Sequence, residues 1–224
     1  LVPMKAHSER IPDKNIRQFN GRPLFHWILA TLTGASSIDD IVVNTDSPRI
    51  MEEAADQFGA TVIERPEPLR GDTVPMNDIL LHDVRAIQAD LFLQTHCTNP
   101  LLRSETIDDA INTHLADDDH DSLFSVTPIK TRLWDKDATP INHERDELVP
   151  TQDLDPVYEE NSNLYLFTRS SIERRENRIG DTPCMYPMDA QEAIDIDYPI
   201  DFKFAEFLHR DRYGDAPSPD VMAP

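Results

Sequence analysis

The chain contains little cysteine, glycine or lysine. Its 224 residues include two cysteines, six glycines and five lysines. Cys97 and Cys184 lie far apart and lack the spacing of a metal site, so we expect reduced thiols and no disulfide framework. No apolar run is long enough to span a bilayer, and the segment after Leu1 shows neither the charged nor the apolar part of a secretory signal. These absences predict a soluble, cytoplasmic protein with no membrane partner.

Positive charge is also scarce. The chain has 42 acidic and 21 basic residues, a formal net charge of −21, and its 28 aspartates outnumber its 14 glutamates. Such a composition indicates either a cationic partner or a heavily hydrated surface that resembles those of proteins from high-salt cytoplasm. We favour the hydrated surface. A nucleic-acid partner is not expected, because its phosphates would be repelled by nearly every face of the molecule.

Short apolar runs alternate with segments of helical period along most of the chain. The runs at 41–43, 61–63, 91–93 and 122–127 read as strands. We expect helices to begin at Pro23, at Ser47-Pro48, at Asp72 or Thr73, after Ser104 and near Pro199. The alternation predicts an α/β protein with a three-layer, Rossmann-like, mostly parallel sheet of about seven strands.

The domain boundaries follow from where this pattern fails. We expect one α/β domain over residues 1–212 and a flexible tail at 213–224. Between 128 and 156 no period holds, and an excursion of that length usually serves as a lid or a dimer arm. The last helix is expected to turn four side chains inward, those of Ile200, Phe204, Phe207 and Leu208.

A basic loop follows the first expected strand. From Lys5 to Arg22 there are five cations and two anions, a net charge of +3 within an acidic chain. The loop lies at the carboxyl edge of the sheet, where open α/β sheets bind ligands, and its charge suits an anion. No Walker-type phosphate loop is present. The loop therefore predicts a phosphate site, with a merely solvated basic turn as the alternative.

Asp195 and Asp197 flank one apolar residue near the C-terminus. In extended chain this spacing places both carboxylates on one side and turns Ile196 toward the core. Two carboxylates on one side suit Mg²⁺. The alternative, in a chain so rich in aspartate, is a solvated or capping pair. Asp201 reads as a structural residue in the first turn of the last helix.

Gln94 ends an apolar strand at the same sheet edge. Its amide could orient a sugar oxygen, or it could simply bond to the loop backbone. His96, two residues further on, could act as a base near neutral pH, but a hydrogen-bonded loop histidine is the favoured interpretation.

Taken in order, several short motifs resemble one family across nearly the whole chain. They are the first loop, Thr45-Asp46, Arg65-Pro66, Gln94 with Thr98-Asn99-Pro100-Leu101, Glu160-Asn161, and Asp195-Ile196-Asp197 leading to Asp201-Phe202. The pattern is similar to that of the acylneuraminate cytidylyltransferases, which include the CMP-sialic acid synthetases. The resemblance implies that CTP and a sugar, most naturally a sugar acid, react to give a CMP-sugar and pyrophosphate. It also implies Mg²⁺ and a homodimer.

The resemblance implies a role for each matching residue. Lys5, Arg10, Lys14 and Gln94 would form the catalytic set, with Gln94 and Asn161 facing the sugar. The metal ligands would be Asp195 and Asp197. The nucleotide-binding group would be Ser8, Asn15, Arg65, Asp72 and Thr73.

Some positions depart from the family pattern. The usual Arg-Gly-Gly-Ser-Lys reads Lys5-Ala6-His7-Ser8-Glu9, without either glycine. Thr151 and Glu159 stand where sialic acid enzymes carry arginines that approach the sugar carboxylate. Either another cation substitutes or the acceptor differs. The candidate cations in the excursion are Lys130, Arg132 and Lys136.

Two other functions are weighed against this one. A nucleotide-sugar glycosyltransferase of related fold also uses an Asp-x-Asp metal site, but there the motif typically follows a middle strand. A non-catalytic nucleotide- or sugar-binding relative would explain the altered first loop. Such a binder has little need of both metal aspartates, so we favour the enzyme.

Overall fold

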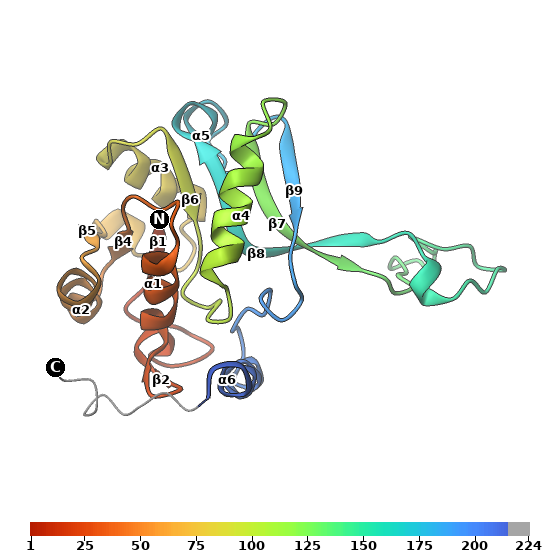
Figure 1. Ribbon diagram of the computed structural model, residues 1–224, viewed down its shortest axis with the longest axis horizontal. Coiled ribbons are helices and arrows are strands. Elements are labelled where there is room, and N and C mark those ends of the chain that lie inside the picture. Colours follow the sequence, from red (N-terminus) through yellow and green to blue (C-terminus); the bar gives the residue numbers. More distant parts are fainter. Residues whose placement is uncertain (215–224) are drawn as a thin grey trace.

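Two β-sheets form the centre of the protein, and the computed structural model describes residues 1–214 of the chain (Figure 1). The first sheet is parallel, with the strand order β1-β4-β5. Its strands are short: β1 is Val2–Met4, β4 is Val42–Thr45 and β5 is Thr61–Glu64. The α/β class predicted from the alternation of apolar runs is confirmed.

The second sheet has four strands in the order β6-β8-β7-β9. Its members are β6 Leu91–Gln94, β7 Ser122–Ile129, β8 Val157–Thr168 and β9 Pro183–Pro187. The backbone nitrogen of Leu1 donates to Leu93 O at 2.6 Å, and the backbone of Thr95 donates to Leu1 O at 3.1 Å. The two sheets therefore meet where the chain entering β1 lies beside β6.

The prediction of one mostly parallel sheet was wrong in its detail. Strand β8 runs antiparallel to both of its neighbours, β6 and β7, and only the β7–β9 pair of this sheet is parallel. The reason lies in the connection, since β7 returns to β8 through the excursion as a long hairpin and not through a helix. A hairpin forces antiparallel pairing, whereas parallel neighbours need a crossover.

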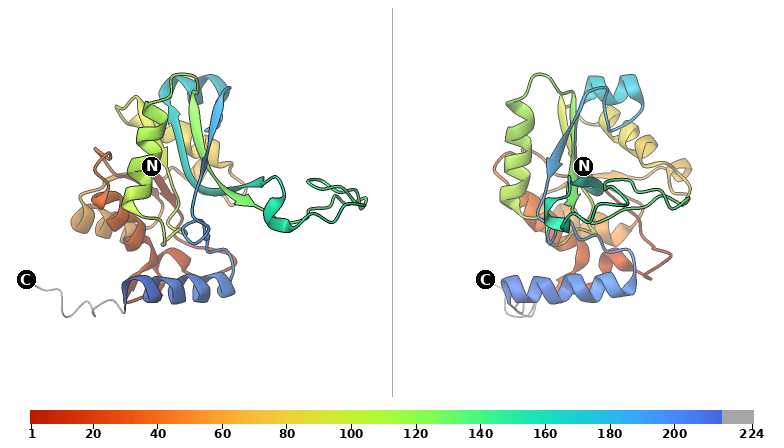
Figure 2. Two further views of the ribbon diagram at one scale, coloured as in Figure 1. Left: turned by 45° about the vertical axis from the view of Figure 1, so that its right-hand side comes forward. Right: turned by 90° about the vertical axis from the view of Figure 1, so that its right-hand side faces the viewer.

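Helices cover both faces of the four-stranded sheet. Figure 2 shows α4 on one side of it and α3 with α5 on the other, while α6 crosses the base of the molecule. Three buried clusters fill the spaces between these elements. The helices are α1 Leu24–Gly34, α2 Pro48–Phe58, α3 Met76–Ala86, α4 Ser104–Leu115, α5 Arg169–Arg175 and α6 Pro199–Tyr213. None of the described helices is long and apolar enough to cross a membrane.

Local capping signals place most helix ends as expected. Ser47 caps α2, accepting a hydrogen bond from the backbone of Ile50, and Gly59 ends it at a φ of 63°. Helix α3 begins at Met76 behind Pro75, later than the predicted start at Asp72 or Thr73. The two earlier residues belong to the turn at the edge of the cleft described below.

Helix α6 is rotated relative to the prediction. Ile200, Phe204 and Phe207 are exposed, whereas Phe202 is buried. The Phe202 ring lies edge-on to the Phe19 ring, with 5.4 Å between the ring centroids. Both sides of this helix carry apolar residues, so its periodicity could not select the buried side. Packing against the base of the first loop decides which side faces inward.

The excursion between β7 and β8 projects from the body as a long arm (Figures 1 and 2). Its base is the antiparallel pairing of β7 with β8, and near its end an isolated bridge joins Trp134 to Pro140. The short helix Thr151–Asp153 precedes the return into β8. Of the predicted tail at 213–224, the first residue, Tyr213, ends helix α6, and residues 215–224 lie outside the described part of the chain.

Candidate active site

A cleft of about 570 Å³ opens at the carboxyl ends of β1, β5 and β6. Its walls come from the first loop, from the turns after β5 and β6, and from the extended segment that precedes α6. Nine of the predicted site residues line it, namely Lys5, Ser8, Arg10, Lys14, Asn15, Arg65, Asp72, Asp195 and Asp197. The structure therefore brings together groups that are nearly 200 positions apart in the chain.

The first loop is held to the body by polar contacts at its beginning and end. The backbone of Ala6 donates to Asp46 Oδ1 at 2.6 Å, and Asn15 Nδ2 donates to Lys5 O at 2.9 Å. The Cys97 thiol donates to Asn15 Oδ1 at 3.1 Å. Burial raises the pKa of Cys97 to about 12, so the thiol keeps the proton that this bond needs. These bonds fix where the cations of the loop can lie.

Each cation of the predicted triphosphate site is paired with an acidic or carbonyl group of the cleft. Lys5 Nζ lies 2.7 Å from Asp72 Oδ1, and Arg10 Nη1 lies 2.9 Å from Asp197 Oδ2. Lys14 Nζ donates to the Ile196 carbonyl at 2.6 Å and lies 3.8 Å from Asp197 Oδ1. The hydrogen bond from Lys5 lowers the pKa of Asp72. The basic loop and the acidic segment thus face each other across the cleft.

The two C-terminal aspartates flank a buried residue, as their spacing predicted. Ile196 has no exposed surface and donates its backbone N–H to Thr98 O at 3.0 Å, while Asp195 and Asp197 both line the cleft. Burial raises the pKa of Asp195, and its Oδ1 has no hydrogen-bond partner among the described residues. A buried carboxylate oxygen without a donor, beside a second carboxylate, fits a hard divalent cation such as Mg²⁺.

The segment that carries these aspartates is fixed at both ends. Upstream, Arg103 Nε donates to Glu192 Oε1 at 2.6 Å, and Glu192 is almost completely buried. Downstream, Asp201 Oδ2 accepts hydrogen bonds from the backbones of Asp197 at 3.1 Å and Tyr198 at 2.7 Å. Asp201 therefore has the structural role that its place in the first helical turn predicted.

Arg65 is buried at the edge of the cleft. It is 1% exposed, and its guanidinium donates to Asn44 Oδ1 at 2.6 Å and to Asn44 O at 3.1 Å. Burial lowers the pKa of Arg65. The Nε and Nη2 groups of Arg65 are therefore committed to strand β4.

Three predicted residues are not among those that line the cleft. Thr73 lies in the turn next to Asp72, and Gln94 is fully buried at the end of β6. Asn161 lines an adjoining cleft of about 610 Å³. The Asn161 amide is already engaged, since Oδ1 accepts from Ser125 Oγ at 2.6 Å and Nδ2 donates to Thr127 Oγ1 at 3.1 Å.

Gln94 is covered by two residues that do line the cleft, His96 and Arg178. Its Nε2 donates to His96 Nε2 at 2.9 Å, and its Oε1 accepts from Arg178 Nη1 at 2.7 Å. Burial, followed by the charges of Arg178 and Lys14, lowers the pKa of His96 to about 3. His96 is thus a neutral hydrogen-bonded imidazole at physiological pH, as the favoured interpretation of the sequence had it.

Arg178 is the main cleft residue that the sequence did not reveal. It stands in the irregular loop between α5 and β9, beside two other arginines at the end of α5, and no motif distinguishes it from them. A buried cation could have been suspected only from the three-dimensional neighbourhood of Gln94.

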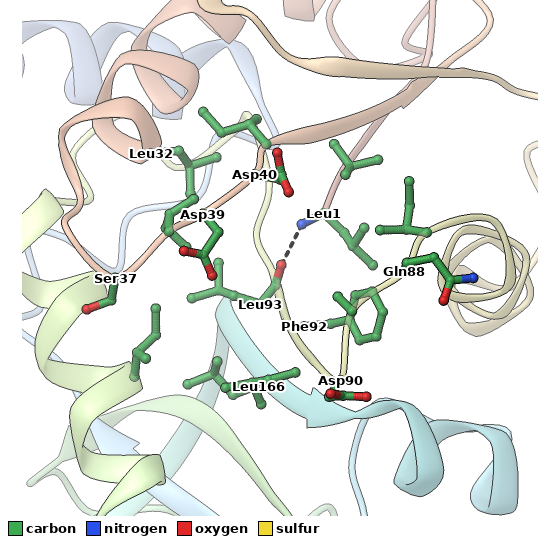
Figure 3. A pocket seen from close by; sticks show the side chains of 17 residues that line it. Leu1, Leu32, Ser37, Asp39, Asp40, Gln88, Asp90, Phe92, Leu93 and Leu166 are labelled. Carbon is green, nitrogen blue, oxygen red and sulfur yellow. Dashed lines mark hydrogen bonds between the residues drawn. The ribbon is translucent and has the colours of Figure 1, made fainter.

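A second cavity, of about 320 Å³, lies at the opposite edge of the strands (Figure 3). Leu1, Phe92, Leu93 and Leu166 contribute apolar surface to it, and Figure 3 shows the Leu1 nitrogen bonded to the Leu93 carbonyl at its centre. Its charged side chains are acidic, and none of the described residues that line it is lysine or arginine. This cavity lacks the means to bind a triphosphate.

A cluster elsewhere has ligand atoms close together. Those of Asp117, His120 and Cys184 lie within 4.8 Å of one another, and Asp117 and His120 are already joined by a hydrogen bond of 2.7 Å. None of the three lines the cleft.

The family model described as cytidylyltransferase matches residues 1–213. The CMP-N,N′-diacetyllegionaminic acid synthase of Legionella pneumophila is 33% identical to the chain, over 93% of the chain and 94% of its own length. The N-acylneuraminate cytidylyltransferase of Oncorhynchus mykiss is 28% identical over 92% of the chain, which spans 49% of that longer protein. A solved CMP:2-keto-3-deoxy-manno-octonic acid synthetase superposes with a TM-score of 0.68 at 16% identity, covering 94% of the chain and 97% of its own.

Proposed function

Because the chain belongs to the cytidylyltransferase family, we propose that it activates a sugar acid with CTP, releasing pyrophosphate and a CMP-sugar acid. One observation carries the proposal beyond the family: the basic first loop and the Asp195/Asp197 pair face each other across a single cleft. A triphosphate needs the cations, and a metal that would neutralise its charge needs the carboxylates. A glycosyltransferase would need no free triphosphate site, and the family match leaves that alternative without support.

The reaction is an in-line displacement at the α-phosphorus of CTP. The anomeric hydroxyl of the sugar gives up its proton to solvent as its oxygen bonds to the α-phosphorus, the bond from that phosphorus to the bridging oxygen breaks, and pyrophosphate leaves. Charge gathers on the phosphate oxygens, so positioning and neutralisation supply most of the catalysis. Lys5, Arg10 and Lys14, which line the cleft, would neutralise this charge, and Asn15 holds the loop that carries them.

Asp195 and Asp197 are proposed to hold Mg²⁺ through their carboxylate oxygens. When bound, the metal would neutralise phosphate charge and polarise the oxygens that react. The donor set fits, because Asp195 Oδ1 is buried without a hydrogen-bond partner among the described residues. The capping of α6 by Asp201 keeps the backbone of Asp197 in place.

The remaining predicted residues have supporting roles in this proposal. Ser8, Asp72 and Arg65 lie along the wall that would take the nucleotide, with Thr73 in the adjacent turn. Gln94 would act on the sugar indirectly, through His96 and Arg178, the two residues that cover it. Asn161 would shape the wall shared with the adjoining cleft, where Ser162, Asp195 and Asp197 belong to both cavities.

We also propose that the protein works as a cytoplasmic homodimer joined through the arm. The arm projects from the body (Figure 1) and exposes Trp134, Ile141 and Leu148, the last of them 87% exposed. Large apolar side chains at the end of a projecting hairpin are typical of a surface that another subunit covers. Light scattering should give twice the 25.6 kDa chain mass, and a variant with polar residues at these three positions should give one chain mass.

Pyrophosphate release tests the proposed activity. The protein should be incubated with Mg²⁺, each nucleoside triphosphate in turn, and a panel of eight- and nine-carbon sugar acids, at low and high salt. We expect release with CTP and at least one sugar acid, and its loss with a chelator or in Asp197→Asn. Tight CTP binding without release across the panel would instead favour the non-catalytic relative.

A further inference from the structure

The loop that carries Arg178 is fixed by hydrogen bonds from the backbone of that residue and from the backbone of Gly180, two positions further on. The backbone of Arg178 donates to Asn77 Oδ1 at 3.2 Å, and the backbone of Gly180 donates to Ser122 Oγ at 2.8 Å. The first contact ties the loop to α3 and the second ties it to the start of β7. The guanidinium is therefore presented to the cleft by a well-defined backbone.

The Arg178 guanidinium is enclosed but poorly neutralised. Its side chain is 17% exposed, and its Cζ lies 3.5 Å from the centre of the Tyr165 ring. Nη1 donates to the neutral amide of Gln94. Within ion-pair distance the described residues offer it one carboxylate, Glu160, at 3.9 Å from Nη2, and the Tyr165 hydroxyl already donates to that carboxylate. A desolvated cation with so little compensation favours an additional anion nearby.

The other cations are committed elsewhere. Lys5, Arg10 and Lys14 of the first loop face Asp72 and Asp197, where the triphosphate and metal are proposed to bind. The three candidate cations of the arm bond within the arm: Lys130 Nζ donates to Gln152 O at 2.9 Å, and Lys136 pairs with its neighbour Asp137 at 3.0 Å. The third, Arg132, donates to the Val149 carbonyl.

The charge of the adjoining cleft restricts where an acidic acceptor can place its carboxylate. Glu159 and Glu160 both line that cleft, and they would repel an anion. Arg178 lines the main cleft together with Ser162 and Asp195. An acceptor that directs its reacting hydroxyl toward the aspartates can direct its acidic group toward the guanidinium.

We propose that Arg178 binds the carboxylate of the sugar-acid acceptor and does so from within the same subunit. The assignment rests on the proposed function, and it identifies a cation for a chain that has Thr151 and Glu159 in place of the expected arginines. A planar guanidinium can donate two parallel hydrogen bonds to a carboxylate, which a lysine cannot do. Gln94, bonded to Nη1, would hold the plane of the fork.

The test compares an acid with its uncharged analogue. Kinetics with CTP are measured for wild type, Arg178→Gln and Arg178→Lys, using the sugar acid that wild type turns over and the carboxamide of that acid. We expect Arg178→Gln to raise the KM for the acid about 10–100-fold and to leave the KM for CTP within about twofold of wild type. The KM for the carboxamide should be the same in Arg178→Gln and wild type. Arg178→Lys keeps the positive charge but not the planar guanidinium, so its KM for the acid should lie between those of wild type and Arg178→Gln.

Two further variants sharpen the result. Glu160→Gln removes the competing carboxylate and should lower the KM for the acid a few-fold. Arg175→Gln is the matched control, because Arg175 is exposed and pairs with Asp181 at 2.6 Å on the outer side of the same loop. It should change neither KM, and circular dichroism establishes that every variant is folded.

The outcomes separate the two proposals. Equal losses with the acid and the carboxamide would show that Arg178 only positions Gln94, and a raised KM for CTP would place it at the triphosphate; either result overturns the assignment. If wild type is active and Arg178→Gln has the same KM for the sugar acid as wild type, the assignment of Arg178 is overturned and the proposed function is not. A folded wild type without turnover on any sugar acid would overturn the proposed function first.

Discussion

The two edges of the strands carry opposite chemistry. At the carboxyl edge, Lys5, Arg10 and Lys14 face the Asp195/Asp197 pair. At the amino edge, a smaller cavity is walled by leucine, isoleucine and phenylalanine, with only acidic charged side chains at its rim (Figure 3). The first cavity is lined by the end of β1 and the turn after β6, and the second by Leu1, just before β1, and by β6 itself. A sheet edge therefore becomes a site through the loops attached to it, which is the general rule for open α/β sheets.

The comparison also explains how a chain with a formal net charge of −21 can bind a triphosphate. Its basic residues are not spread evenly, because the first loop alone has a net charge of +3 between Lys5 and Arg22. A local positive field within an acidic surface directs an anion to one place and repels it elsewhere. The acidic coat thus adds selectivity to the cleft.

The largest effect is expected at Asp197. Asp197→Asn keeps the size of the side chain but removes the charge that pairs with Arg10 and is proposed to hold the metal. We expect the rate of pyrophosphate release to fall about 100- to 1000-fold, because an electrostatic contact at the reacting phosphate is lost. Steady-state kinetics at saturating CTP measure it. A loss below about tenfold would remove Asp197 from the metal site.

A pH experiment tests the carboxyl edge in the absence of substrate. The folded His96 has a pKa of about 3, below the value of about 6.5 in an unfolded chain, so the unfolded chain takes up the proton first as the pH falls. Stability is then lost as the pH falls from 6.5 toward 3. Wild type should lose free energy of unfolding between pH 7 and pH 4, and we expect His96→Asn to reduce that loss by about 2 kcal/mol. This is less than the whole pKa shift of His96 would give, because the ring is partly exposed.

Denaturant unfolding at pH 7, 5.5 and 4 measures this difference. Gln88→Asn, a polar change at the amino edge, is the control and should leave the pH dependence of wild type unchanged. Parallel pH profiles for wild type and His96→Asn would contradict the prediction.

A smaller effect is expected at Lys14. Lys14→Met keeps the aliphatic part of the side chain but removes its bond to the Ile196 carbonyl and its attraction to Asp197. We expect kcat/KM for CTP to fall about tenfold, the usual cost of one charged hydrogen bond. A fall confined to the sugar acid would instead place Lys14 beside the acceptor.

The smallest effect is expected at the amino edge. Asp90→Asn changes a charged residue at the rim of the second cavity (Figure 3) and should leave kcat and both KM values within about twofold of wild type. The same assays as above measure it. A larger change in kcat or in either KM would show that the amino edge also takes part in the reaction.

Local patterns in the sequence predicted a large part of the molecule. Helix α2 could be placed from Ser47, Pro48 and Gly59, because capping depends on a few adjacent residues. The facing of Asp195 and Asp197 also followed from alternation in extended chain, with Ile196 buried between them. The basic loop was visible as a reversal of charge.

Features that depend on distant partners could not be predicted in this way. The antiparallel course of β8 depends on how the arm returns to the body, and the rotation of α6 depends on the Phe19–Phe202 contact. Arg178 belongs to no motif and gains its importance only beside Gln94 and Tyr165. In each case the deciding contact joins residues far apart along the chain, and periodicity contains no information about it.

The ion pair between Arg10 and Asp197 has a thermodynamic consequence. A metal bound to Asp197 Oδ2 at the proposed site would release Arg10, and a phosphate bound to Arg10 Nη1 would release Asp197. Each ligand therefore removes an obstacle to the other, and by reciprocity each must strengthen the binding of the other by the same factor. The salt bridge across the cleft would thus make the proposed metal and the nucleotide bind as a cooperative pair, through an ion pair that the free protein already contains.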